Sequence, residues 1–210
     1  MMRRGAGLPR GNRHPSTGPI GVRHRKGEPF QNVRELCPST QAQWYPGDPK
    51  EDGRGMNQQH LLEGLNSVGP SAERLFSLLP ADKLEWRPRE NMRTLMEVAN
   101  HLAQVPAIDL FILEGASQEA VQERERELRR VAPAELTAVW RGGVGAVSAF
   151  YGGLSDTEFM TGEGKAFYGH VAPLWSWLLD IVTHTYHHRA QLFTYLKQLG
   201  LPVDMMTLYG

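Results

Sequence analysis

Cysteine is nearly absent from this chain of 210 residues, which contains only Cys37. A single cysteine excludes a disulfide within the chain and any zinc or iron–sulfur site built from several cysteines. It also suits a reducing compartment, so we expect a cytoplasmic protein. Long apolar runs are absent as well, since no segment approaches the roughly 18–20 apolar residues of a membrane span, and no apolar signal region follows the basic start. We therefore expect no membrane partner.

The chain also lacks net charge, which is formally zero, so the whole molecule has no strong attraction to nucleic acid. This balance conceals an asymmetry, because residues 1–55 carry ten Lys and Arg against five Asp and Glu. The same segment holds nine Gly and seven Pro without a periodic apolar pattern. That composition predicts a disordered, basic extension over residues 1–55, followed by one folded domain over residues 56–210.

The extension has three interpretations. It is an arm that binds nucleic acid, a targeting sequence, or a stretch of non-native residues ahead of a true start at Met56. The third is favoured because helical patterning begins directly after Met56. Nucleic acid is accordingly not the expected partner.

The folded domain predicts an all-α, up-down-type four-helix bundle, because neither a convincing alternating strand nor an internal repeat is present. The first helix has apolar residues at 3–4 spacing from Leu61 to Leu79, with a kink or break expected at Pro70. The second begins near Thr94, which forms a capping box with Glu97. A third follows Pro133, and the fourth runs from about residue 172 to 199.

The connections are predicted to be loops or solvated segments. Residues 80–92 and 152–168 are expected to connect helices, and residues 117–131, dense in Glu and Arg, to form a solvent-exposed excursion. Within the third helix, Gly142, Gly143 and Gly145 weaken the helix and allow close packing. Trp140, Trp175 and Trp177 are expected in the core, with a substrate-facing wall as the alternative.

Histidines on the second and fourth helices carry the strongest functional signal. His184 and His188 are four apart, which places both imidazoles on one helical face, and His101 lies on the buried side of an earlier helix. Buried imidazoles need partners, and one divalent ion would satisfy all three while keeping open coordination positions. The ligand set suits Zn, Ni, Cu or Fe, and His187 falls off the shared row. A pair at this spacing is also found as ordinary core residues, so the triad depends on His101.

Neighbouring residues add candidate roles. Arg189 and Gln191 are the candidate catalytic residues, since they could orient a bound acid or a water, although Arg189 could equally be an ordinary solvated side chain. The zincin pattern fails, because Thr185 stands where its glutamate base would follow the first histidine. Glu97 is a possible base near His101, but its capping role is favoured.

The segments around His184–Gln191 and Thr94–Leu102 together resemble the DinB-like (DinB/YfiT) superfamily of metal-binding four-helix bundles. The resemblance covers about residues 56–210. It implies that His101, His184 and His188 bind a divalent ion, commonly Zn or Ni, and that the protein is a homodimer. Characterised relatives include transferases that use low-molecular-weight thiols of the bacillithiol or mycothiol type. The extension and the charged segment at 117–131 depart from the typical member.

The favoured hypothesis is therefore a divalent-metal-dependent thiol S-transferase acting on a small-molecule electrophile, since a divalent cation lowers the pKa of a bound thiol. One alternative is metal-dependent hydrolysis, in which the ion activates water. The other is a non-enzymatic, metal-stabilised bundle that acts in stress response as a binding module. The residues leave the substrate, the thiol, the metal and the oligomeric state open.

Overall fold

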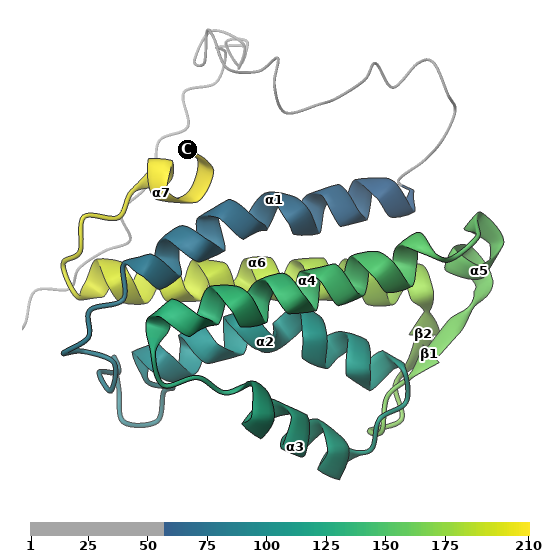
Figure 1. The fold of residues 1–210 in the computed structure, drawn as a ribbon, viewed down its shortest axis with the longest axis horizontal. Coiled ribbons are helices and arrows are strands. Elements are labelled where there is room, and N and C mark those ends of the chain that lie inside the picture. The colour runs from purple at the N-terminus through teal and green to yellow at the C-terminus, as the bar shows by residue number, and fades with distance from the viewer. Residues whose placement is uncertain (1–56) are drawn as a thin grey trace, which may run out of the picture. The chain divides into compact units, whose positions relative to one another are not determined.

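The computed structural model describes residues 57–210, so the predictions for residues 1–55 and for the domain boundary beside Met56 lie outside the described residues. The described part is a four-helix bundle, as predicted (Figure 1). Its long helices are α1 (Gln58–Ser77), α2 (Leu95–Leu113), α4 (Leu136–Gly152) and α6 (Leu174–Gln198). None of the described helices is both long enough and apolar enough to cross a membrane.

The arrangement of the four helices brings α2 and α6 side by side. Helices α4 and α6 each pack against both α1 and α2, so α1 and α2 occupy opposite corners of the bundle. In Figure 1, α2 and α4 run from left to right, whereas α1 and α6 run from right to left. Helix α3 (Gln118–Leu128) carries the chain back between α2 and α4, and a short 3-10 turn, η2 (Pro133–Glu135), leads into α4.

Helix α1 forms because its apolar residues share one face that the bundle buries. The residues of the predicted stripe are all at most 8% exposed: Leu61, Leu65, Val68, Ala72, Leu75 and Leu79. The Asn57 side chain caps the first turn by accepting a hydrogen bond from the backbone N–H of His60. Of the kink or break expected at Pro70, the break does not occur, because the helix continues through this residue. Burial of the apolar face therefore outweighs the hydrogen bond that proline cannot donate.

Helix α2 begins at the predicted capping box. The Thr94 side chain accepts from the Glu97 N–H at 3.1 Å, and the Thr94 N–H donates to the Glu97 carboxylate at 2.7 Å. Farther along, the buried Asn100 pairs with the backbone of Arg130 through both its amide atoms. These bonds fix the charged segment 117–131 against α2, where it forms helix α3 and leaves only Val121 of that helix buried.

The close packing expected of the glycines in α4 holds at one of the three positions. A Cβ at Gly143 would lie 2.9 Å from the backbone nitrogen of Ala107 and 3.2 Å from its Cβ, so α2 and α4 approach closely there. A Cβ at Gly142 or Gly145 would meet no atom within 4 Å. Gly143 thus sets the distance between α4 and the helix that carries His101.

The structure differs from the prediction between residues 152 and 173. Instead of a plain loop, the chain forms α5 (Asp156–Thr161) and two antiparallel strands, β1 (Glu163–Lys165) and β2 (Val171–Pro173). Strands of three residues are too short to produce a recognisable alternation of apolar and polar residues. The hairpin is held to α6 by Trp177, whose indole N–H donates to the Gly164 carbonyl at 3.1 Å.

The C-terminal end of the domain also adds an element that the sequence pattern did not predict. Helix α6 ends as predicted before Gly200, which has a φ of 79°. A further short helix, α7 (Met205–Tyr209), begins at a capping box between Asp204 and Thr207 and packs on α1.

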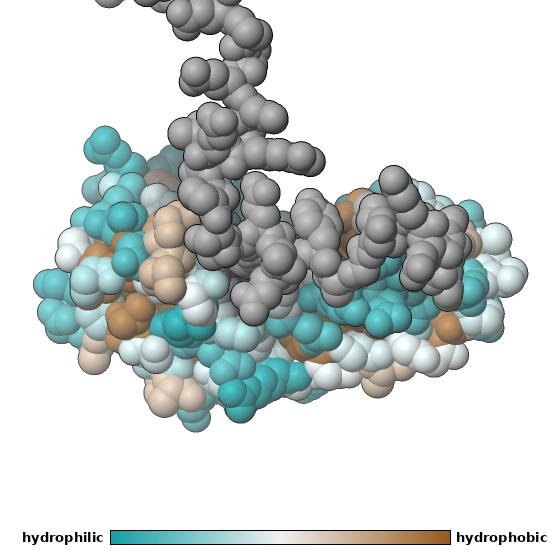
Figure 2. Space-filling view, turned by 90° about the horizontal axis from the view of Figure 1, so that it is seen from above, coloured by the Kyte–Doolittle hydropathy of each residue, from teal (hydrophilic) through white to brown (hydrophobic). Residues whose placement is uncertain are grey.

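On the coloured surface in Figure 2, polar side chains are interspersed with small apolar groups.

Candidate metal centre

The three predicted histidines meet between α2 and α6. His101 comes from α2 and His184 and His188 from α6, and one ligand atom of each lies within 4.8 Å of the other two. The His101 ring centroid is 4.3 Å from that of His188 and 5.3 Å from that of His184. The α6 histidines are one helical turn apart, with ring centroids separated by 4.8 Å. The packing of α2 against α6 therefore creates the cluster that spacing alone suggested.

The cluster favours neutral imidazoles, the form that binds a metal. Burial, together with the nearby charge of Arg93, lowers the pKa of His101 to about 3. Burial likewise lowers the pKa of His188 to about 4, against the opposing effect of its hydrogen bond to Gln191. Both rings are thus unprotonated at neutral pH, with lone pairs available.

Two of the three rings are oriented by an acceptor at Nδ1. His184 Nδ1 lies 2.7 Å from Asp109 Oδ2, and His188 Nδ1 lies 2.8 Å from Gln191 Oε1. An acceptor at Nδ1 holds the proton there and leaves Nε2 of the same ring for a metal ion. Three neutral imidazole donors, two of them oriented in this way, fit a divalent ion and leave positions for other ligands.

Asp109 is the functional residue that the sequence interpretation missed. It is the only charged residue in the otherwise apolar end of α2, between Val105 and Leu113. A lone carboxylate in such a segment needs a partner when it is buried, and its side chain is 16% exposed. That isolation was the signal that could have identified it.

The two candidate catalytic residues lie in different surroundings. Gln191 contacts His188, as described above. Arg189 is only 5% exposed and faces α1 and α7, where its Nη1 donates to Ser71 Oγ at 3.2 Å and its guanidinium lies 4.7 Å from the centroid of the Tyr186 ring. The alternative of a solvated Arg189 is therefore wrong, whereas a catalytic role for either residue stays a prediction.

Other residues considered from the sequence are placed clearly. His187 is exposed and off the ligand row, with its ring centroid 4.7 Å from that of His188. Trp140 and Trp177 are buried, as predicted, but Trp175 is 38% exposed, so the core assignment is wrong for that residue. Glu97 performs the favoured capping role, and the hydrogen bond from the Thr94 backbone lowers the pKa of its carboxyl.

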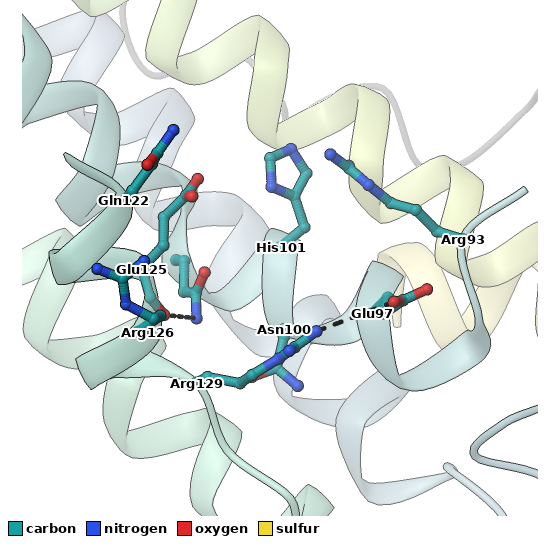
Figure 3. Close-up of a pocket in the computed structure, with 9 residues that line it drawn as sticks. Arg93, Glu97, Asn100, His101, Gln122, Glu125, Arg126 and Arg129 are labelled. Atoms are coloured by element: carbon teal, nitrogen blue, oxygen red, sulfur yellow. Dashed lines mark hydrogen bonds and ion pairs between the residues drawn. The ribbon is translucent and has the colours of Figure 1, made fainter. Parts of the chain in front are cut away.

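A cavity of about 320 Å³ lies between α2 and α3 on the His101 side of the cluster (Figure 3). Figure 3 shows the Arg93 side chain extending toward His101. The lining is strongly polar and comprises Arg93, Glu97, Asn100, His101, Gln104, Gln122, Glu125, Arg126 and Arg129. The charged segment predicted to be a solvated excursion therefore supplies one wall of a cavity beside the cluster.

A larger cavity of about 790 Å³ lies on the His184 side. The hairpin and α6 contribute aromatic rings to it, and α2 and α6 contribute two carboxylates. The lining comprises Asp109, Ile112, Tyr168, His170, Trp177, Asp180, Thr183, His184 and His187. Trp177 thus both belongs to the core and forms part of a cavity wall. The histidine cluster is reached from two cavities of opposite character, one rich in arginine and one acidic and aromatic.

The DinB family model matches residues 53–210. The chain belongs to the DinB family. This match agrees with the predicted resemblance and spans the whole described bundle. A search of curated proteins finds no match.

Solved structures of DinB-like proteins share the fold. A protein assigned to the DinB family from Exiguobacterium sibiricum is 26% identical, with a TM-score of 0.60, covering 71% of this chain and 97% of its own. A DinB-like protein from Bacillus cereus is 20% identical, with a TM-score of 0.57, covering 71% and 98%. YfiT from Bacillus subtilis, described as a probable metal-dependent hydrolase with an unusual four-helix bundle topology, is 17% identical, with a TM-score of 0.56, covering 74% and 94%.

Proposed function

We propose that this DinB-family protein is a divalent-metal-dependent enzyme that transfers a low-molecular-weight thiol to an electrophilic small molecule. The observation that carries the proposal is the meeting of His101, His184 and His188 between two cavities. The imidazoles would hold Zn or Ni, which when bound supplies a positive charge that stabilises thiolate at neutral pH. Residues 57–210 contain no cysteine, so the described part of the chain supplies no thiol of its own.

The carboxylates of Glu97 and Asp109, which lie beside the ligand histidines, are already engaged, which favours a nucleophile that needs neither of them as a base. Glu97 is held by the Thr94 backbone, and Asp109 is paired with His184. His187 is exposed in the larger cavity and can accept the proton that a thiol loses on binding. Asp109 and Gln191 hold the α6 rings in place, and Trp177 with Tyr168 offers an apolar wall for an electrophile.

Hydrolysis is the second candidate, and a specific observation favours it. The chain shares its fold with YfiT, which carries the description of a probable metal-dependent hydrolase. In that case His187 would accept the proton of an attacking water instead of that of a thiol. The two candidates use the same histidines and differ only in the nucleophile.

The metal requirement is tested by elemental analysis of the purified protein and of three alanine variants. We expect close to one equivalent of a divalent metal in the wild type, and a large loss in His101→Ala and His188→Ala. The control His60→Ala replaces an exposed histidine of α1 outside the cluster and should retain the metal. Equal metal content in all four proteins would contradict the proposal.

The reaction is tested with a model electrophile and a panel of small thiols, with and without added Zn, Ni or Mn. Conjugation that needs both thiol and metal supports the transferase. Ester turnover without thiol supports the hydrolase instead. Metal binding with neither activity would support the third hypothesis, a non-enzymatic, metal-stabilised bundle. The expected homodimer and cytoplasmic location stay predictions, and size-exclusion chromatography with light scattering measures the first.

A further inference from the structure

Arg93 stands out among the charged residues of the smaller cavity because it lacks an acidic partner. Arg126 pairs with Glu123, and Arg129 lies 3.9 Å from the Glu97 carboxylate. Within residues 57–210, no carboxylate pairs with Arg93 and its guanidinium has no hydrogen-bond acceptor. An arginine of this kind can form two parallel hydrogen bonds with an incoming anion without first breaking an ion pair.

The backbone of Arg93 is held where the two ligand-bearing helices meet. It directly precedes Thr94, the cap of α2, and its backbone carbonyl accepts a hydrogen bond from the Tyr195 hydroxyl of α6 at 3.3 Å. Its side chain extends from this junction toward His101 (Figure 3). The guanidinium is close enough to both ligand-bearing helices that its charge disfavours protonation of His101 and of His188.

The opposite side of the cluster has no comparable cation. The charged groups that line the larger cavity are the carboxylates of Asp109 and Asp180, with His170, His184 and His187 as the titratable rings. The smaller cavity carries three arginines against the carboxylates of Glu97 and Glu125, so an anionic group is attracted at Arg93 and repelled in the larger cavity. The two cavities therefore orient a ligand that carries an anion at one end and an apolar body at the other.

We propose that the small cavity beside His101 is an anion subsite, in which Arg93 binds a carboxylate of the thiol or substrate that reaches the metal. The inference rests on the proposed metal site and narrows its ligands to anionic molecules. It also assigns to Arg93 the carboxylate-binding role considered for Arg189, whose side chain faces α1 and α7.

The test is calorimetric titration of the zinc-loaded full chain with three probes. 3-Mercaptopropionate carries thiol and carboxylate, 2-mercaptoethanol carries thiol alone, and succinate carries carboxylates alone. We expect Arg93→Gln to lower the affinity for 3-mercaptopropionate and for succinate by about tenfold, because a charge-assisted hydrogen bond is lost. The affinity for 2-mercaptoethanol should not change. Arg93→Lys should restore part of the affinity, and Arg89→Gln, an exposed arginine outside the cavity lining, should change nothing.

The outcomes separate this inference from the proposed function. Zinc titration of each protein is done first, and Arg93→Gln should bind zinc at least as tightly as the wild type, since a positive charge beside the ion is removed. Failure of the wild type to bind zinc contradicts the metal site itself. Succinate binding that depends on Arg93 without any thiol binding supports the subsite and contradicts the thiol reaction. Equal affinities of wild type and Arg93→Gln for both anions, or no binding of either anion to the zinc-loaded wild type, overturn the subsite.

Discussion

Asp109→Asn is expected to weaken zinc binding strongly while leaving the bundle folded. The carboxylate lies 2.7 Å from His184 Nδ1, and its side chain is 16% exposed, so the bond is charge-assisted and partly shielded from water. The amide keeps the shape of the carboxylate but loses the charge that balances the ion and fixes the ring's tautomer. Removal of such a partner costs about 10–100-fold in metal affinity, or about 1.4–2.7 kcal/mol.

The measurement is competitive zinc titration at pH 7 against a chelator of known affinity, with circular dichroism melting to confirm the fold. Asp180→Asn is the matched control, because Asp180 lines the same cavity but is exposed and makes no side-chain contact with the triad. Its zinc affinity should stay within about twofold of the wild type, since an exposed charge is screened by solvent. A wild-type affinity in Asp109→Asn, or an equal loss in Asp180→Asn, would refute the assigned role.

Three further outcomes follow from packing, capping and burial. Gly143→Ala should destabilise the protein by about 1–3 kcal/mol, because the new Cβ would lie 2.9 Å from the Ala107 backbone nitrogen. Gly142→Ala places its Cβ in open space and should stabilise the protein by about 0.5–1 kcal/mol. Both changes are measured by urea unfolding. Thr94→Ala should cost about 1 kcal/mol by removing the cap of α2, seen as a lower melting temperature. In the metal-free protein, the free energy of unfolding should fall by up to about 2 kcal/mol for each of His101 and His188 as the pH is lowered from 7 to 5, measured by urea unfolding.

The sign of the pH effect follows from lowered pKa values. Unfolded histidines take up protons below about pH 6.5, whereas His101 and His188 stay neutral in the folded state until about pH 3 and 4. Their stabilising contribution is complete above pH 6.5 and is lost as the pH falls. A double variant, His101→Gln with His188→Gln, should show a flatter profile, and an unchanged slope would contradict the burial of these rings. Likewise, a stabilising Gly143→Ala together with a destabilising Gly142→Ala would contradict the close approach of α2 and α4.

Local sequence signals were sufficient for most helices. The stripe from Leu61 to Leu79, the capping box at Thr94 and the stop at Gly200 each depend on contacts within a few residues, so they can be recognised without the fold. The short hairpin and α7 escaped prediction, because strands of three residues and a helix of five residues give no usable period. The paired spacing of His184 and His188 is equally local, and it indicated a shared face.

Tertiary structure alone decided what those histidines meet. The sequence by itself determined that two imidazoles share a face of α6 and that His101 lies near the buried side of α2, because helical period is a property of neighbouring residues. Only the packing of α2 on α6 brought in Asp109, turned Arg189 toward α1, and placed Arg93 beside His101. Adjacent residues on a helix point about 100° apart, so the partner of each side chain is set by which helix occupies that side of the bundle.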